Sequence, residues 1–571
     1  MLGCENDGEA NMADAARTTG RRLFLELLKQ EGVKVLFGNP GTTELPLMEA
    51  LAGEEELRYV LALQESVVMA MADGYARASR GIAACNVHVA PGLGNAMGML
   101  FDAQKAGSAI LVTAGQQAQG FGITEPNLYA ELPEIAAHMT KYAVEARSVR
   151  DLPVLLHRAV KTALAAPSGP VFVSLPVDVM NAEAEVALGA PSRVPALGVA
   201  DAAEVGRAAA LLVRAARPVI IAGDAVDQSG AAEALIAFAE ALGAPVYLEG
   251  ETSTLPFPPA HPLFRGPIVR LGPAIRRILD QHDLLFSAGA DLFTLSLPPE
   301  VEPVPEGLAI VHLDTDPWQL GKNFPTASAL LGDPAATLPA LTAALEAGFD
   351  AAGVARRDAR RAATEAAIAA DFAALDARAT AEAGRTPVSP LALMQAVGRH
   401  LPANGVVVDE TISSGGGLFQ FLRRAAPGSL FGMRGGGIGW GLPAAVGVQL
   451  ALPERRVVAL VGDGSAMYSI QALWTAAHEK VPVIFVIINN KSYRILKQRA
   501  AASRGAAAQT GRYVGMELRE PAISFTGLAA SMGVPAVAVD TIGEFVAALK
   551  LGLASDHPLL IEVAADATFQ G

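Results

Sequence analysis

The stretch Val457–Ser492 constrains the fold of this chain more than any other part of the sequence. It opens with a continuous apolar run, Val457–Val461, which is typical of a strand buried on both faces of a parallel sheet. The turn Gly462–Ser465 and a helical pattern then lead to a second apolar run, Pro482–Ile488, which ends in two asparagines. This order predicts one βαβ unit. Both of its polar clusters follow the carboxyl end of a strand, where open α/β sheets bind ligands.

The polar residues of this unit suit a magnesium ion and a diphosphate. Mg²⁺ prefers octahedral oxygen ligands, few of them from protein and the rest from phosphate and water. Asp463 offers a carboxylate, Asn490 an amide oxygen and Ser492 a backbone carbonyl. The glycines at 462 and 464 let backbone N–H groups approach a phosphate. Taken alone, either the turn at 462–465 or the asparagine pair at 489–490 could belong to an ordinary crossover with polar turns. The two together in one βαβ unit favour a cofactor site.

Bulk composition excludes several classes of protein. The chain has 571 residues, of which 51% are hydrophobic and 18% charged, as expected for three or four globular domains rather than a disordered chain. A net charge of −14 without a basic cluster argues against a nucleic-acid surface. The only cysteines are Cys4 and Cys85, so no disulfide framework or Cys-rich zinc site is expected.

No segment of the sequence has the character of a membrane span or a secretory signal. The longest apolar runs are far shorter than a bilayer requires, and Met1–Thr19 is acidic and lacks an apolar core. We therefore expect neither a nucleic-acid nor a membrane partner, and a cytoplasmic location.

Apolar strands alternate with helical patterns of ten or more residues in three blocks of the chain. This alternation predicts three α/β domains with doubly wound, mostly parallel sheets. The first and third blocks are similar in size and alternation, which would suit a cofactor held between two related sheets. The predicted organisation is an N-terminal extension over 1–19, a first domain over 20–182, a linker over 183–201, a middle domain over 202–345, a helical connector over 346–386 and a third domain over 387–564.

The segment GDGSAMYSIQALWTAAHEKVPVIFVIINN resembles the diphosphate-anchoring motif of thiamine diphosphate enzymes. Within that superfamily it is most similar to benzoylformate decarboxylases, and the resemblance extends from about Leu36 to Val563. It implies pyrimidine-binding, middle and diphosphate-binding domains, with thiamine diphosphate and Mg²⁺ as cofactors. In such enzymes the cofactor lies between the first domain of one subunit and the third domain of another. A homodimer or homotetramer is therefore expected.

The resemblance assigns catalytic roles to three residues of the first domain. Glu65, in RYVLALQES, matches the Glu that hydrogen-bonds ring nitrogen N1′ of the aminopyrimidine; taken alone, it suits a helix N-terminus. His88 ends an apolar strand before the glycine-rich loop Pro91–Asn95, and it matches a His that transfers protons and positions the substrate carboxylate. Thr42, in GNPGTTELP, stands where the family has a Ser that contacts that carboxylate.

The third domain supplies the remaining cofactor contacts that the resemblance implies. The carbonyl of Gly436 would accept from the cofactor's 4′-amino group, and Ile438 would enforce its V shape. The glycine cluster Met433–Gly441 follows no convincing strand and lacks an acidic residue at the expected distance, which argues against NAD. The metal ligands expected are Asp463, Asn490 and Ser492. The full set of expected cofactor-binding residues is Glu65, Thr411, Ile412, Ser413, Gly436, Ile438, Gly462, Asp463, Gly464, Ser465, Asn490, Ser492 and Tyr493, with a helix N-cap as the local alternative for Thr411–Ser413.

The sequence departs from benzoylformate decarboxylases at the substrate pocket. Their second catalytic His is absent, and Ser296 falls at about its place. Ile495 and Arg499 replace an Ala and a Phe, so the pocket should be narrower and more cationic. These changes leave the aromatic substrate and the protonation step open.

The favoured hypothesis is non-oxidative decarboxylation of a 2-oxo acid to an aldehyde and CO₂. The alternative is a carboligase or lyase of the acetolactate synthase or 2-hydroxyacyl-CoA lyase type, in which a second carbonyl compound takes the place of the proton. Loss of the second His suits that alternative, and bound flavin would discriminate acetolactate synthases. A non-catalytic α/β scaffold is disfavoured by Glu65, Asp463 and Asn490 together, and no GxSxG motif supports a serine hydrolase.

Overall fold

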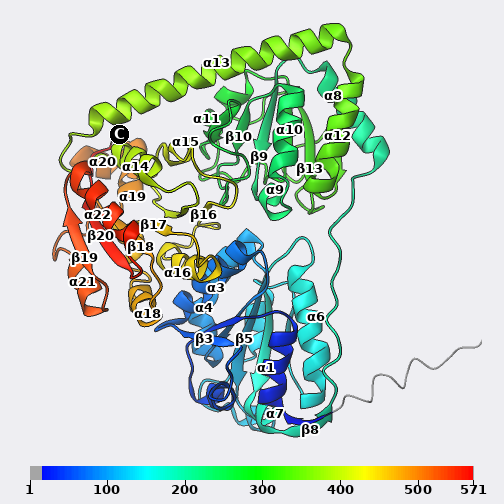
Figure 1. Ribbon diagram of the computed structural model, residues 1–571, viewed down its shortest axis with the longest axis vertical. Helices are drawn as coiled ribbons and strands as arrows, with labels where there is room; N and C mark the ends of the chain where they lie inside the picture. The colour runs from blue at the N-terminus through cyan, green and yellow to red at the C-terminus, as the bar shows by residue number, and fades with distance from the viewer. Residues whose placement is uncertain (1–15, 570–571) are drawn as a thin grey trace, which may run out of the picture.

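The computed structural model describes residues 16–569 of the chain. Most of the expected N-terminal extension, with Cys4, therefore lies outside the described residues. Three six-stranded sheets form the framework, and every adjacent pair of strands within them is parallel. Figure 1 shows the three sheets as separate units, with the first in blue and cyan, the second in green and the third in yellow to red. The predicted doubly wound α/β architecture is confirmed.

The first sheet has the strand order β3-β2-β4-β5-β7-β6. Its strands are β2 (Val35–Gly38), β3 (Arg58–Leu61), β4 (Ala83–Val87), β5 (Ile110–Gln116), β6 (Ala143–Glu145) and β7 (Val171–Pro176). The helices around it are α1 (Gly20–Gln30), α2 (Leu45–Leu51), α3 (Glu65–Ser79), α4 (Val89–Ala106), α5 (Leu132–Ala137), α6 (Leu152–Leu164) and α7 (Val177–Asn181), with 3-10 turns η1 (Thr42–Glu44), η2 (Gln119–Thr124) and η3 (Val149–Asp151). Beside it, β1 (Ala16–Thr19) pairs antiparallel with β8 (Glu183–Val186), so the predicted linker begins in a strand.

The third sheet repeats the topology of the first. Its order is β16-β15-β17-β18-β20-β19, which is 2-1-3-4-6-5 when its strands are numbered in chain order, as in the first sheet. The strands are β15 (Val406–Glu410), β16 (Leu430–Gly432), β17 (Val457–Gly462), β18 (Ile484–Asn489), β19 (Ala536–Val539) and β20 (Leu559–Ala564). The helices are α14 (Pro390–His400), α15 (Leu418–Phe421), α16 (Gly441–Ala451), α17 (Asp463–Ala466), α18 (Ala472–His478), α19 (Arg494–Ala502), α20 (Ala506–Thr510), α21 (Phe525–Ser531) and α22 (Ile542–Ala554).

The middle sheet has a different order, β11-β10-β9-β12-β13-β14, equivalent to 3-2-1-4-5-6. This is the order of doubly wound nucleotide-binding sheets. Its strands are β9 (Pro218–Ala222), β10 (Val246–Leu248), β11 (Phe264–Pro267), β12 (Leu284–Ala288), β13 (Ala309–Asp314) and β14 (Ser328–Leu331). The helices are α8 (Ala202–Arg214), α9 (Asp224–Gln228), α10 (Ala232–Leu242), α11 (Gly272–Leu279) and α12 (Pro334–Gly348), and the long helix α13 (Ala351–Glu382) then crosses from this unit to the third sheet (Figure 1).

In each sheet the strand order reverses beside the strand that comes first in the chain, and ligands bind at such points in open α/β folds. The reversal lies between β2 and β4 in the first sheet, between β9 and β12 in the middle sheet and between β15 and β17 in the third. The residues that follow these strands are polar in all three sheets. The fold therefore places three polar clusters at three equivalent positions.

Helices α3 and α16 join the first and third sheets. A side chain on Gly74 would collide with the carbonyl of Ala444, and one on Gly447 would collide with that of Met71. Glycine thus allows close helix packing at both positions. Met71 faces Gly447 and Gly74 faces Ala444, so the residue numbers increase along α3 in the direction in which they decrease along α16. The two helices therefore run antiparallel.

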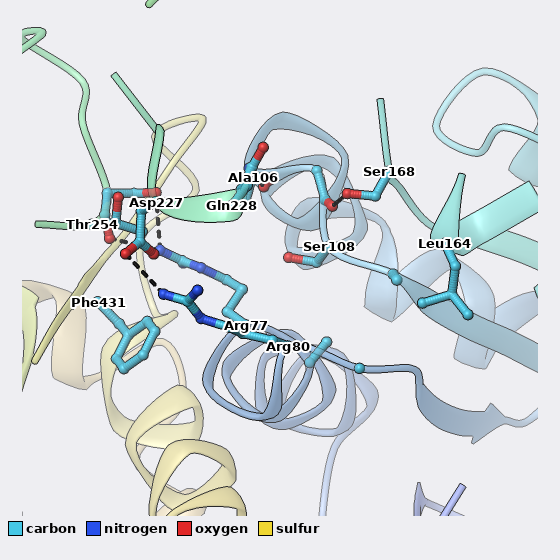
Figure 2. Close-up of a pocket in the computed structure, with 15 residues that line it drawn as sticks. Arg77, Arg80, Ala106, Ser108, Leu164, Ser168, Asp227, Gln228, Thr254 and Phe431 are labelled. Atoms are coloured by element: carbon cyan, nitrogen blue, oxygen red, sulfur yellow. Dashed lines mark hydrogen bonds and ion pairs between the residues drawn. The ribbon is translucent and has the colours of Figure 1, made fainter. Parts of the chain in front are cut away.

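The middle domain meets this helix pair at Arg77 of α3, whose side chain is only 7% exposed. Its guanidinium donates to the carbonyl of Gly432 at 2.9 Å and to the carbonyl of Ser253 at 2.7 Å, and it lies over the ring of Trp440. One side chain therefore connects all three domains beside a cavity of about 190 Å³ (Figure 2). Among residues 16–569, no helix combines the length and apolar character that a membrane span requires.

The structure corrects three local expectations. Pro91–Asn95 is not a loop but part of α4. Proline is tolerated in a first helical turn, and Gly92 is needed because a Cβ there would lie 2.9 Å from the Glu65 carboxylate. Gly462–Ser465 does not simply turn the chain, since Asp463 begins the short helix α17. Finally, the glycine cluster does follow a strand, the short β16.

Candidate active site

His88 lies at the carboxyl end of β4, directly before α4, and is held by a buried carboxylate. Its Nδ1 is 2.7 Å from Oε2 of Glu44 and 3.2 Å from the hydroxyl of Thr43. The backbone approaches the ring so closely that a side chain on Gly41 would collide with it. The segment after β2 therefore contacts one edge of the imidazole and restricts the position of the ring.

Glu44 receives donors at both carboxylate oxygens. Oε1 accepts from the hydroxyl of Thr43 and from the backbone N–H of Gly115, each at 2.9 Å, and Oε2 accepts from the N–H of Gly41 at 2.8 Å. A carboxylate with three such partners is an acceptor, so the proton of neutral His88 belongs on Nδ1. The lone pair of the imidazole then lies on Nε2, which is the nitrogen available for proton transfer.

Replacing Glu44 by Gln is expected to lower kcat by about 10²-fold, because the amide N–H₂ would face the N–H of Gly41 and disturb the His88 tautomer. The pH profile of kcat and the melting temperature should be measured together. A role exercised through His88 predicts that Glu44→Gln adds little to a His88→Ala variant. Fully additive losses, or an unchanged kcat in the single variant, would contradict this role.

Glu65 is the first residue of α3 and lies beside His88. It is buried at 7% exposure, and its Oε2 accepts from the side-chain amide of Asn95 at 3.0 Å. The position where a Gly92 side chain would begin is 2.9 Å from Glu65 Oε1 and 3.3 Å from His88 Cβ. The structure thus brings Glu65, His88 and Glu44 together, and Thr42 stands exposed on the same loop as Glu44.

Asp463 and Asn490 follow two neighbouring strands of the third sheet. Gly462 at the end of β17 is in register with Ile488 of β18, which brings the two strand ends side by side. Burial raises the pKa of Asp463 to about 6, while the nearby backbone N–H groups of Gly464, Lys491 and Ser492 oppose the rise. The Oδ1 of Asn490 accepts from the N–H and hydroxyl of Ser492 at 3.1 and 2.9 Å.

The donor set fits a magnesium ion. Oδ2 of Asp463 is buried without a hydrogen-bond partner among residues 16–569, an arrangement that is costly unless another group pairs with it. Within the same range no cluster of three His, Cys, Asp or Glu residues surrounds a potential metal position. One carboxylate together with amide and carbonyl oxygens suits Mg²⁺, which takes its other ligands from phosphate and water.

The other expected diphosphate contacts surround Asp463. Gly464 lies under Tyr493, whose ring would be 2.6 Å from a Cβ at that glycine. Ser465 is buried within α17. Thr411–Ser413 form a turn after β15 in which Ile412 has a positive φ of 49°, so the alternative of a helix N-cap is wrong there. Arg494 donates to the carbonyl of Ser413 at 2.9 Å and ties this turn to α19.

Gly436 and Ile438 lie in the loop between β16 and α16. Gly435, Gly436 and Gly439 have φ values of 97°, 92° and 102°, which only glycine adopts without strain. A Cβ on Gly436 would meet nothing within 4 Å, so this part of the loop faces open space. Ile438 is half-buried.

The single chain keeps the two halves of the expected site apart. Glu65 begins α3, whereas Gly436 precedes α16, and the two helices are antiparallel. Along the helix axis Glu65 is therefore at least roughly 18 Å from the start of α16, at 1.5 Å per residue. A site that uses both residues needs a second copy of the chain.

Two of the residues at which the sequence departs from the expected substrate pocket are Ser296, in the middle domain, and Arg499, in the third domain. Ser296 is exposed, and its N–H donates to the carbonyl of Arg270 at 3.1 Å. Burial, and then the positive charge of Arg499, lower the pKa of Arg270. Arg270 also pairs with Glu251. Two arginines from different domains thus lie near the position of the missing His.

Sequence reasoning missed Glu44 and Thr43, although both stand in the GNPGTTELP motif beside Thr42. An acidic residue next to the expected substrate contact was the available signal. It could not show that the carboxylate contacts His88, which lies 44 positions later in the chain.

Comparisons with known proteins agree along the chain. Models of the thiamine pyrophosphate enzyme family match in three places: the N-terminal TPP-binding domain at residues 18–121, the central domain at 205–341 and the C-terminal TPP-binding domain at 413–563. The three matches fall on the three sheets.

Individual relatives are similar over nearly their whole length. The chain is 34% identical to benzoylformate decarboxylase of Pseudomonas aeruginosa, over 94% of this chain and 97% of the relative. It is 30% identical to a putative acetolactate synthase large subunit of Mycobacterium tuberculosis, over 95% and 98%. Among solved structures, a thiamine diphosphate-dependent 4-hydroxybenzoylformate decarboxylase from Rhodococcus jostii RHA1 superposes with a TM-score of 0.84 at 31% identity, covering 96% of this chain and 99% of that one.

Proposed function

The chain belongs to the thiamine pyrophosphate enzyme family, and on that premise we propose that it decarboxylates a 2-oxo acid non-oxidatively to an aldehyde and CO₂. The proposal rests on the pairing of His88 with Glu44 beside Glu65, which forms a proton-transfer group at one switch point. When bound, thiamine diphosphate supplies the electron sink that lets a 2-oxo acid lose CO₂. The chain's own residues supply binding, orientation and proton traffic.

The third domain would anchor the cofactor through its diphosphate and Mg²⁺. Asp463 Oδ2 and the Ser492 carbonyl would hold the metal. Asn490 Oδ1 would join them by giving up a hydrogen bond that it accepts from Ser492. Thr411–Ser413, Gly462, Gly464, Ser465 and Tyr493 would border the diphosphate, and Gly436 and Ile438 the aminopyrimidine. In the first domain, Glu65 would hold a proton at the pyrimidine ring, His88 Nε2 would exchange a proton with the substrate, and Thr42 would contact its carboxylate. Because these halves are separated within one chain, we propose a homodimer as the minimal active unit, with a homotetramer compatible.

A carboligase is the second candidate, and the exposed Ser296 favours it. A serine hydroxyl cannot deliver a proton at neutral pH as an imidazole does. Slower protonation would leave a second carbonyl compound more time to react in place of the proton. The similarity to an acetolactate synthase subunit supports the same candidate.

Incubation with benzoylformate, with and without thiamine diphosphate and Mg²⁺, tests the proposal. We expect CO₂ and benzaldehyde in equal amounts only when both cofactors are present. A Glu65→Gln variant serves as the catalytically impaired control. Excess CO₂ over aldehyde, with a hydroxyketone as product, would favour the carboligase, and bound flavin would indicate an acetolactate synthase type.

No turnover of benzoylformate would show that the aromatic substrate is wrong. Smaller 2-oxo acids and 2-oxo acids with a second carboxylate are the next substrates to compare. The second group is included because Arg270 and Arg499 place positive charge near the pocket.

A further inference from the structure

Arg434 leaves the third domain and inserts its guanidinium into the middle domain. The side chain is buried at 7% exposure. Nη1 lies 3.1 Å from Asp224 Oδ2 and donates to the carbonyl of Glu251 at 2.7 Å, and Nη2 lies 2.9 Å from Asp291 Oδ2. The bonds converge from two directions, so the planar guanidinium is fixed in orientation as well as position.

The partners of Arg434 mark the switch point of the middle sheet. Asp224 follows β9 and Asp291 follows β12, the two strands between which the order reverses. A doubly wound sheet usually binds its ligand in that crevice. Here this chain's own arginine occupies it.

The hydrogen-bond donors around Asp224 stabilise its ionised form, which can pair with a cation. Its carboxylate accepts from the N–H and hydroxyl of Ser253 at 2.9 and 2.7 Å and from the N–H and hydroxyl of Thr254 at 3.1 and 2.8 Å. Burial alone would raise its pKa, but Arg434 and these hydrogen bonds lower it overall. Removing Asp224 would therefore disturb several contacts, whereas Asp291 is a simpler partner to vary.

Arg434 directly precedes the glycine loop, defined here as Gly435–Gly437. At the other end of this loop, the N–H of Gly437 donates to Oδ1 of Asp102 on α4 at 3.0 Å. The loop is thus fixed at one end by the middle domain and at the other by the first domain. Gly436 lies between the two anchors and faces open space.

We propose that Arg434 is a positioning residue through which the middle domain, by way of Asp224 and Asp291, sets the carbonyl of Gly436 for the cofactor's 4′-amino group. This inference rests on the proposed function, which assigns Gly436 to that amine. It gives the middle domain a specific part in cofactor recognition, although none of its residues is expected to touch the cofactor.

The variant Asp291→Asn tests the proposal while Asp224 and the Glu251 carbonyl still hold Arg434. We expect the Kd of thiamine diphosphate with saturating Mg²⁺ to rise about tenfold, within the usual range of coupling between sites. Isothermal titration calorimetry on the full-length protein measures this directly. Arg434→Lys should also weaken binding, since lysine keeps the charge but not the forked geometry.

The matched control is Asp227→Asn. Asp227 lies on α9, as Asp224 does, and pairs with Arg80 of the first domain at 3.1 Å (Figure 2). This pair also joins two domains, but it does not contact the glycine loop. Asp227→Asn is expected to leave the Kd unchanged even if it lowers the melting temperature by a similar amount.

A thiamine diphosphate analogue that lacks the 4′-amino group separates loop positioning from general loosening. Without that amine the Gly436 carbonyl has no donor from which to accept a hydrogen bond. Wild type and Asp291→Asn should therefore bind the analogue with nearly equal Kd. An equal penalty for cofactor and analogue, an equal loss in Asp227→Asn, or no loss in Asp291→Asn would each overturn the proposal. Failure of the wild type to bind thiamine diphosphate would instead refute the proposed function.

Discussion

Replacing Glu65 by Gln is expected to lower kcat by about 10³-fold, within the range for loss of a positioned acid–base group. Thiamine diphosphate should still bind with a Kd within a few-fold of wild type. Glutamine has the same shape and its amide oxygen can still accept from Asn95, but it cannot exchange a proton with the pyrimidine ring. Steady-state kinetics together with calorimetric binding would separate the two effects.

The control for Glu65 is Glu54→Gln, which removes a carboxylate of the same domain that pairs with Lys29 instead. It should leave both kcat and cofactor affinity unchanged. If Glu65→Gln kept turnover within about threefold of wild type, the assigned proton transfer would be wrong. A loss of cofactor binding equal to the loss of turnover would instead indicate a binding role.

Replacing Asp463 by Asn should have the largest effect on cofactor binding. We expect the Kd of thiamine diphosphate in the presence of Mg²⁺ to rise at least about 100-fold, since even outer-shell partners of a metal cost 10- to 100-fold. The cofactor-free variant should melt at or above the temperature of the cofactor-free wild type. This follows because Oδ2 of Asp463 is buried without a partner, and removing its charge removes a desolvation cost.

Opposite signs for stability and binding distinguish a metal ligand from a structural residue. Differential scanning calorimetry without cofactor and titration calorimetry with it provide the two measurements. Asp556→Asn, which changes an exposed carboxylate of the same domain, is the control and should alter neither. A lower melting temperature with unchanged cofactor affinity would show that Asp463 is structural.

Most strands were predictable because a central strand of a parallel sheet is buried on both faces. Val457–Val461 and Ile484–Ile488 are continuous apolar runs for that reason, and every residue in them is buried. Four strands of the three large sheets, β6, β11, β14 and β16, have no such run of apolar residues in the sequence, and each lies at a sheet edge. A run of three or four residues is too short to show a strand pattern, and an edge strand is paired on one side only, so these segments carry no comparable signal.

A predicted helix boundary was wrong where tertiary contacts outweighed the local conformational preference of the sequence. The segment Pro91–Asn95 has the composition of a loop, yet it forms part of the first two turns of α4. The glycines cost helix stability, but Gly92 makes room for the carboxylate of Glu65. That requirement arises from a neighbouring helix and cannot be seen in the local sequence.

The family, the α/β class and the polar residues that end the central strands could all be inferred from the sequence, because motif spacing and strand burial are local properties of the chain. The family models confirm the resemblance to thiamine diphosphate enzymes. Which strand ends become neighbours depends on the three-dimensional packing of the chain. This packing paired His88 with Glu44, inserted Arg434 between Asp224 and Asp291, and placed Glu65 and Gly436 at opposite ends of two antiparallel helices. These relations depend on strand order and domain packing, which join residues far apart in sequence through contacts that no local pattern encodes.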